Sequence, residues 1–189
     1  MSSTLILILA IVVIILLVVI SIFNSLTNKK NQVTKAFGTI DVQLKNRYDL
    51  IPNLVATVQQ YAAHERELLT KITDLRTKAL AQNVTPEDRV KLDNQISSAI
   101  SGLMVAVENY PDLKASQNFI DLQRALNEVE SQIAAARRAY NASVTDYNNA
   151  IEMFPGNLMA GMMLLKTKSV FTASEAEREN VNVNNLFQS

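Results

Sequence analysis

The feature that most constrains this chain is an uninterrupted apolar segment near its N-terminus. The residues from Leu5 to Phe23 contain no charged side chain and consist almost entirely of Leu, Ile and Val. A helix of about 19 residues is long enough to cross the hydrocarbon core of a bilayer. Because the lipid core offers no water to bond the backbone, a helix is the only single-pass structure there. The segment therefore predicts one transmembrane helix, with the lipid bilayer as a partner.

A cleaved signal peptide is the competing interpretation of this segment. It is disfavoured because no Lys or Arg precedes the apolar run, the run is too long, and no small-x-small cleavage site follows. Lys29, Lys30 and Lys35 lie just after the segment. Positive charge on one flank predicts a cytoplasmic location for that side of the membrane. We therefore expect a single-pass membrane protein with its short N-terminus outside the cell and its C-terminal domain in the cytoplasm.

The overall composition excludes several classes of function. The chain holds 18 Lys and Arg residues against 18 Asp and Glu residues, so no charge excess points to a nucleic acid partner. It has no cysteine, which excludes disulfides, thiol catalysis and thiolate metal sites. With only four glycines and four prolines, the composition favours long helices over sheets.

Apolar residues continue at intervals of three and four beyond the apolar segment, from Phe37 through Leu75 to Ala79. This spacing is typical of a helix in a bundle or coiled coil. Only Arg47 and Glu65 interrupt the apolar positions. No proline or glycine lies between Asn24 and Gly38, so the transmembrane helix can continue directly into this helix. We expect the helix to end near residue 82.

Pro52 lies within the periodic stretch and has two interpretations. The apolar spacing keeps its phase across Pro52, which favours a kink in one helix. The alternative is a new helix that is capped by Asp49 and has Pro52 in its first turn, where a missing N–H is harmless. Both interpretations keep the segment helical.

Two further helices follow. Thr85 is the expected N-cap of the first, with Pro86 at its first position, and this helix ends near Tyr110 and Pro111. The second begins near Phe119, carries apolar residues at intervals of three and four as far as Phe154, and is stopped by Pro155 and Gly156. Short connections place neighbouring helices antiparallel. The fold class expected is all-α: an N-terminal transmembrane helix followed by an antiparallel bundle of three to four long helices.

The expected domain organisation has three parts. Residues 1–27 form the anchor, residues 28–168 the helical bundle, and residues 169–189 a partly ordered tail. Residues 158–165 are apolar, rich in Met and followed by Lys166 and Lys168, yet too short to span a membrane. They could pack as a cap over the end of the bundle, or form a surface helix that touches membrane or a partner.

Few residues suggest chemistry. The single histidine, His64, lacks the second histidine at four-residue spacing that a helical zinc site requires. Arg47 and Glu65 fall on an apolar face and need partners, which predicts a role in fixing helix register or pairing. Arg137 and Arg138 are expected to be solvated or to form salt bridges. No phosphate-binding loop or catalytic triad is recognisable, so we expect no enzyme, no cofactor and no metal site; a polar site of Arg47, Glu65 and Arg137 is the remote alternative.

Three blocks of sequence resemble one family in order and in content. They are residues 40–55 (IDVQLKNRYDLIPNLV), residues 108–115 (ENYPDLKA), and residues 136–157, which open with ARRAYN and close with FPGN. Together with the N-terminal apolar segment they resemble the LemA family of bacterial membrane proteins over nearly the whole chain. The Asn-rich end departs from the pattern of the family. The resemblance implies an N-terminal span followed by an antiparallel helical bundle, in a family whose molecular function is unsettled and which has no established catalytic residues.

The leading functional hypothesis is a membrane-anchored helical scaffold or interaction protein of the bacterial envelope, which associates with itself as a homo-oligomer or with other membrane proteins. The alternative is a signalling or regulatory membrane subunit in which the helix through Pro52 transmits a change. The candidate register and interaction residues are Arg47, Tyr48, Asp49, Pro52, Asn53, Glu65, Tyr110, Pro111, Arg137, Arg138 and Tyr140.

Overall fold

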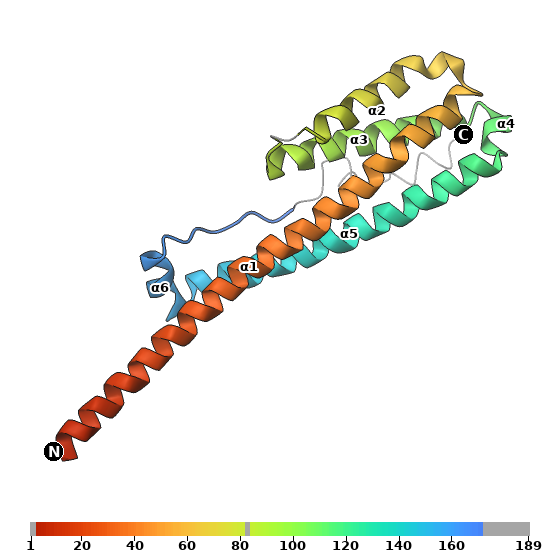
Figure 1. The fold of residues 1–189 in the computed structure, drawn as a ribbon. Helices are drawn as coiled ribbons and strands as arrows, with labels where there is room; N and C mark the ends of the chain where they lie inside the picture. The colour runs from red at the N-terminus through yellow and green to blue at the C-terminus, as the bar shows by residue number, and fades with distance from the viewer. Residues whose placement is uncertain (1–2, 82–83, 172–189) are drawn as a thin grey trace, which may run out of the picture. The chain divides into compact units, whose positions relative to one another are not determined.

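The computed structural model describes residues 3–81 and 84–171, and all regular secondary structure in that part of the chain is helical. The expected all-α class is confirmed. The elements are α1 (Ser3–Gln59), the 3-10 turn η1 (Ala63–Glu65), α2 (Arg66–Ala79), α3 (Pro86–Val107), α4 (Pro111–Lys114), α5 (Gln117–Glu152) and α6 (Gly156–Met162) (Figure 1).

Helix α1 runs without a break for 57 residues. The expected continuation of the apolar segment into the next helix is therefore confirmed. The large apolar side chains from Leu5 to Ile20 are between 42% and 62% exposed, which would be unfavourable in water. This stretch is long and apolar enough to cross a membrane, so α1 carries a candidate transmembrane helix. Pro52 lies inside α1, and the alternative of a new helix capped by Asp49 is wrong.

The end of α1 differs from the sequence prediction. The sequence predicts a single helix that ends near residue 82, but α1 ends at Gln59 and α2 begins at Arg66. In the intervening turn the N–H of Ala62 donates to the carbonyl of Val58 at 2.8 Å. No proline or glycine marks this turn, so its cause is tertiary: α2 packs against α3, and this burial overrides the local preference for a continuous helix. The apolar spacing predicts that Tyr61 is buried, but because of this turn Ala62 is buried and Tyr61 is exposed.

The later boundaries follow local signals. The hydroxyl of Thr85 accepts a hydrogen bond from the N–H of Asp88 at 3.1 Å, which confirms Thr85 as the N-cap of α3. Pro111 begins the short helix α4, and α5 then runs to Glu152. Phe154, expected on the buried face of α5, lies beyond the end of the helix and is 79% exposed, so that expectation is wrong.

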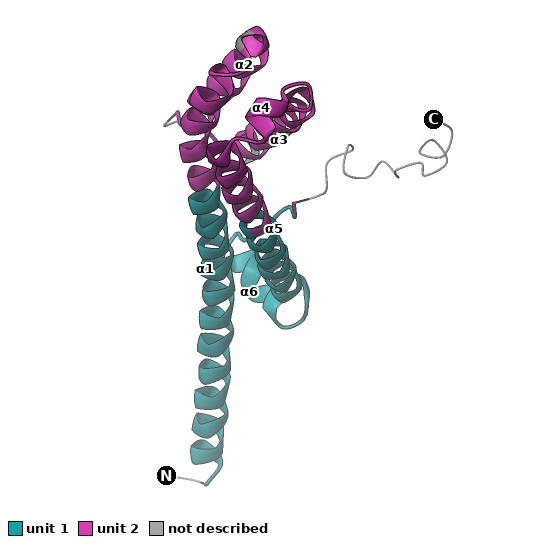
Figure 2. Ribbon diagram, turned by 90° about the vertical axis from the view of Figure 1, so that its right-hand side faces the viewer, with its two compact units in different colours: residues 1–43, 132–170 teal, residues 44–131, 171–189 magenta. Residues whose placement is uncertain are grey.

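The chain forms two compact units (Figure 2). In unit 1 the described residues are 3–43 and 132–170; in unit 2 they are 44–81, 84–131 and 171. Unit 1 holds α1 antiparallel to α5, since Lys29 pairs with Asp146 at 3.7 Å while Phe37 contacts Tyr140 edge to face. Unit 2 contains the last part of α1, the helices α2, α3 and α4, and the first part of α5. Of the tail expected at residues 169–189, residues 172–189 lie outside the described part.

Candidate functional site

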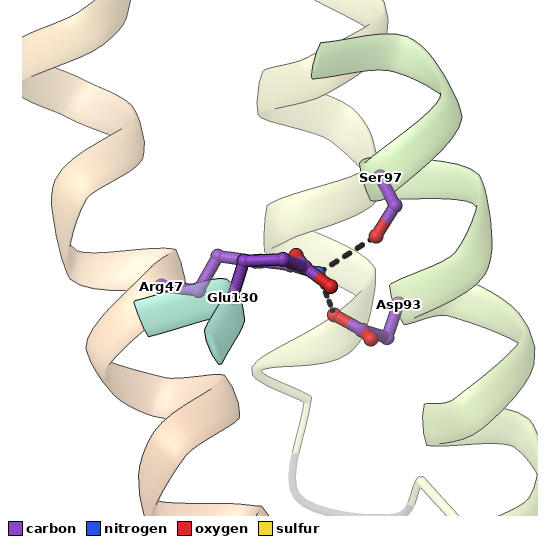
Figure 3. Close-up of polar contacts among 4 residues, drawn as sticks. All are labelled: Arg47, Asp93, Ser97 and Glu130. Carbon is purple, nitrogen blue, oxygen red and sulfur yellow. Dashed lines mark hydrogen bonds and ion pairs between the residues drawn. The ribbon is translucent and has the colours of Figure 1, made fainter. Parts of the chain in front are cut away.

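The polar centre of unit 2 is built around Arg47. Its neighbours one turn away on α1, Leu44 and Ile51, are buried, so the same face of the helix carries the arginine into the interior, where it is 3% exposed. Its Nη1 donates to Asp93 Oδ1 at 2.8 Å and to Ser97 Oγ at 2.7 Å. The guanidinium also forms an ion pair with Glu130 (Figure 3).

These contacts join three helices. Asp93 and Ser97 lie one turn apart on α3, whereas Glu130 lies on α5. The side chain of Asp93 is 1% exposed and that of Glu130 is 52% exposed, so one carboxylate is enclosed and the other reaches solvent. Removing one partner of an enclosed ion pair leaves an uncompensated charge, so the arrangement favours a single pairing of helix faces. The site can therefore fix the register of α1 against α3 and α5.

A second set of contacts surrounds Tyr48 and Pro52. The Tyr48 side chain is 2% exposed in the core of unit 2. Pro52 has no N–H and cannot bond the carbonyl four residues before it, which is that of Tyr48. Arg76 on α2 takes this place, because its Nε donates to the Tyr48 carbonyl at 2.7 Å. The proline thus leaves the Tyr48 carbonyl without a donor in α1, and the hydrogen bond from Arg76 joins α2 to α1 at this point.

Glu65, just before α2, has a partner just after the end of α3. The hydroxyl of Tyr110 donates to Glu65 Oε1 at 3.2 Å, which joins η1 to the connection between α3 and α4. Desolvation raises the pKa of Tyr110, and the hydrogen bond and charge of Glu65 raise it further. Pro111 follows as the first residue of α4.

The remaining candidate residues occupy other positions. Asp49 forms an exposed ion pair with Lys45 at 2.6 Å, and Asn53 is exposed on the same helix. On α5, Arg137 is half-buried and Arg138 is exposed. The candidates thus divide between the units: unit 1 holds Arg137, Arg138 and Tyr140, and unit 2 holds Arg47, Tyr48, Asp49, Pro52, Asn53, Glu65, Tyr110 and Pro111.

Sequence reasoning missed the partners of Arg47 and the role of Arg76. Asp93 lies three residues before the buried Ile96, so it occupies the apolar face of α3 and could have been found as an acid on that face. Glu130 also lies three residues before a buried residue, Ile133, but its side chain is 52% exposed, so its position gives a weaker signal. Arg76 carries no such signal, since its role depends on the backbone of another helix.

The acidic side chains do not assemble a metal site in the part of the chain that the structure describes. There, no group of three or more His, Cys, Asp and Glu side chains is placed to hold a metal ion. A shallow depression near the start of α2 is lined by His64, Glu65, Glu67, Leu68 and Lys71. It mixes both signs of charge, which indicates no particular ligand.

The chain is similar in sequence to one protein family and to several known proteins. The sequence model of the LemA family matches residues 36–185. The chain is 32% identical to Protein LemA of Metamycoplasma hominis over 163 residues, which cover 86% of this chain and 74% of that protein. It is 25% identical to Magnetosome protein MamQ 2 of Paramagnetospirillum magneticum over 88% of this chain and 70% of that protein. Magnetosome protein MamQ of Magnetospirillum gryphiswaldense is 23% identical with the same coverage. None of these names denotes a reaction.

Proposed function

This chain belongs to the LemA family, and we propose that it is a membrane-anchored scaffold without catalytic activity, whose bundle surfaces bind other membrane proteins or further copies of itself. The observation that carries the proposal is that the ionisable side chains of the polar core are paired with other side chains of the same chain. Arg47 is occupied by Asp93, Ser97 and Glu130, and Glu65 is occupied by Tyr110. Paired groups of this kind specify how helices meet, whereas a catalytic site keeps groups available for a substrate.

The orientation we propose rests on the lysines that follow the candidate transmembrane segment. Lys29, Lys30 and Lys35 favour the cytoplasmic side for the helical units, with the residues before Leu5 on the outer side. The absence of cysteine allows a direct test, because every introduced thiol is unique. In intact cells a membrane-impermeant maleimide is expected to label Ser3→Cys, whereas Val42→Cys reacts only after permeabilisation. The opposite pattern would reverse the orientation.

The surface that we propose for self-association includes Val105. Among the large apolar side chains exposed in the described part of unit 2, Val105 on α3 is the most accessible at 71%, ahead of Tyr61 at 43% and Leu80 at 42%. Because apolar side chains are enriched where proteins meet, this most exposed apolar position of unit 2 is the one at which we probe self-association.

Cysteine crosslinking in native membranes tests this surface. Val105→Cys is expected to give a dimer with a short bismaleimide, and blue-native gels of gently solubilised wild type should show a species larger than the monomer. Gln95→Cys, an exposed polar position on the same helix, is the matched control and should remain uncrosslinked. A monomer on gels at all concentrations, together with no crosslink at Val105, would overturn self-association. Mass spectrometry of crosslinked cells would then identify other partners.

A regulatory role is the second candidate, and one observation favours it. At Pro52, helix α1 replaces a backbone hydrogen bond by the longer-range bond from Arg76 to Tyr48. A change in the conformation of α1 near Pro52 would therefore alter its hydrogen bond with α2 directly. If the hydrogen bond between Arg76 and Tyr48 transmits a signal, Pro52→Ala should change the phenotype of cells that carry the variant. It should also slow amide hydrogen exchange around residue 52. Unchanged exchange and phenotype would remove the support for this role.

A further inference from the structure

The α5–α6 turn and helix α6 present an apolar surface to the outside of unit 1. Five large side chains are between 64% and 85% exposed: Met153, Phe154, Leu158, Met162 and Leu164. We call these five the outer apolar face. On the other side of α6, Ala160 is buried and Met159 and Met163 pack against the core of unit 1. The helix is thus fixed to the unit while a surface of this kind, unusual on a soluble protein, remains uncovered.

This surface is held next to the end of the transmembrane segment. The core that α6 packs against includes Leu26, and Ile22 packs against the same core from the last turn of that segment. At Gly156, the first residue of α6, an added Cβ would lie 3.8 Å from the side chain of Leu26. The turn therefore lies against α1 at Leu26, about one helical turn beyond Phe23, and Figure 2 shows α6 beside α1 within unit 1.

The position along α1 matches the boundary of a bilayer. From Phe23 to Leu26 a helix rises by about 4.5 Å. The polar headgroup region on each side of the hydrocarbon core is roughly 5–7 Å thick. If Leu5–Phe23 crosses the core, the outer apolar face lies at the level where headgroups meet acyl chains. Amphipathic surface helices bury their apolar side chains at this depth.

The end of α6 is built to expose Leu164. The N–H of Leu165 donates to the carbonyl of Ala160 at 3.0 Å, and the N–H of Leu164 donates to the carbonyl of Gly161 at 3.2 Å. This is the hydrogen-bond pattern of a Schellman C-cap. Glycine is usual at the position of Leu164, yet the leucine has φ 51° and is 85% exposed. A left-handed leucine is strained and gains no burial within the chain. A lipid environment would bury this side chain.

Cationic side chains border the same region. The hydroxyl of Tyr147 donates to the Lys166 carbonyl at 3.0 Å, and Asn148 exchanges two hydrogen bonds of 2.9 Å with the backbone of Lys168. These bonds fix the backbone of both lysines against α5 just after the outer apolar face, while Lys29 and Lys30 follow Leu26 on α1 within about one helical turn. Lysines at this level suit the anionic headgroups of a bilayer surface.

We propose that the outer apolar face inserts into the leaflet next to which unit 1 emerges and forms a second attachment to the membrane. The lipid surface is favoured over a protein partner because α6 packs on a core that includes Ile22 and Leu26, at the end of the transmembrane segment, and because Lys166 and Lys168 follow the outer apolar face. Two attachment points fix the tilt and rotation of unit 1 at the membrane, which a single helix does not. The proposal rests on the membrane anchoring of α1 and is independent of the scaffold role.

Depth-dependent fluorescence quenching tests the attachment in the full chain. Single-cysteine variants carry an environment-sensitive NBD probe in vesicles of phosphatidylcholine and phosphatidylglycerol that contain spin-labelled lipids. The probe at Leu158→Cys is expected to emit at shorter wavelength and to be quenched several-fold more by a nitroxide near the headgroup than the probe at Val42→Cys. Val42 is the matched control, because it is an exposed apolar residue of α1 about 28 Å beyond Phe23 along the helix axis.

Each outcome has a distinct meaning. The probe at Val13→Cys, inside the apolar segment, should be quenched by nitroxides deep in the acyl chains; its failure would overturn the anchoring itself. If Val13 is quenched and Leu158 behaves like Val42, only the second attachment is overturned. A Leu158 probe that is shielded in proportion to protein concentration, without lipid quenching, would instead indicate a second copy of the chain and would also overturn the proposal.

A pair of charge variants checks that the apolar side chains drive insertion. Met162→Asp places a carboxylate on the outer apolar face at a site that is 80% exposed, so the fold tolerates it. The Leu158 probe is then expected to fall to the quenching level of Val42. Thr167→Asp adds the same charge at an exposed position outside the face and should leave the quenching unchanged. Equal effects of the two variants would contradict an apolar contact with lipid.

Discussion

Arg76 of α2 compensates for Pro52 of α1, although no atom of Pro52 takes part in the bond. The proline deprives the Tyr48 carbonyl of its helical donor, and Arg76 Nε supplies a replacement at 2.7 Å. A proline in a helix interior ordinarily leaves such a carbonyl to water, but here Tyr48 is buried. The conformation of α1 at this point therefore depends on the position of α2.

The first prediction concerns this dependence. Arg76→Met preserves the apolar stem but leaves the Tyr48 carbonyl without its donor, and we expect it to lower the free energy of unfolding by about 1–3 kcal/mol. In a Pro52→Ala background the restored N–H can bond Tyr48, so the same change should cost less by about 1 kcal/mol. Urea denaturation in mild detergent, followed by circular dichroism, measures all four variants.

Lys78→Met serves as the control for that double-mutant cycle. Lys78 is exposed on the same helix, so its replacement should change the free energy of unfolding by no more than about 0.5 kcal/mol. An equal cost of Arg76→Met in both backgrounds would show that the bond does not compensate for the proline.

The sequence revealed features that depend on local chemistry. The candidate transmembrane helix follows from one apolar run, and the start of α3 follows from Thr85 and Pro86, whose capping geometry needs no other part of the chain. The turn after Gln59 could not be predicted, because it contains no helix breaker and is set by the packing of α2 on α3. Periodicity alone does not distinguish one long helix from two helices that share a buried face.

The candidate site shows the same division. Arg47 was recognisable because it interrupts an apolar face, and burial of a charge requires a partner. Which acid would meet it was not recognisable, since Asp93 lies 46 residues further along the chain. The contact depends on the arrangement of three helices, which no local pattern specifies.

The second prediction tests whether the Arg47 cluster is structural. Arg47→Met removes the guanidinium from the enclosed carboxylate of Asp93, and we expect a loss of about 3–5 kcal/mol in the free energy of unfolding. Arg47→Met combined with Asp93→Leu removes both charges and should recover part of this loss. Chemical denaturation of the purified chain measures the difference.

Arg124→Met is the control for the cluster. Arg124 pairs with Asp121 at 2.8 Å, but the two side chains are 73% and 56% exposed. Its loss should cost no more than about 1 kcal/mol, since solvent screens the pair. If Arg47→Met left stability unchanged and abolished crosslinking at Val105, the cluster would serve binding and not the fold.

The third prediction concerns the alkaline stability of unit 1. Burial raises the pKa of Tyr147 above its ordinary value of 10.0. Because the folded state favours the neutral Tyr147 phenol, the contribution of this residue to the free energy of unfolding is complete below pH 10. It is lost as the pH rises through the pKa of Tyr147 in the folded state. Phenolate absorbance of wild type minus that of Tyr147→Phe gives the titration of this residue. A midpoint at or below 10 would contradict its burial.

The fourth prediction contrasts two glycines of unit 1. At Gly156 a Cβ would overlap the carbonyl oxygen of Ala150, which is backbone and cannot move aside easily. Gly156→Ala should therefore lower the free energy of unfolding by about 1–3 kcal/mol. At Gly38, inside α1, a Cβ would meet nothing within 4 Å. Gly38→Ala should raise the free energy of unfolding by about 0.5–1 kcal/mol, because alanine loses less backbone entropy than glycine when a helix forms.

The two glycine variants also separate stability from membrane attachment. Gly156→Ala forces the α5–α6 turn away from the backbone of Ala150 and so displaces it, and the Leu158 probe should lose part of its lipid quenching along with the loss of stability. Gly38→Ala leaves the turn in place and should preserve the quenching while the chain becomes more stable. If both variants changed quenching alike, the close packing of Gly156 on Ala150 would not be what holds the outer apolar face at the bilayer.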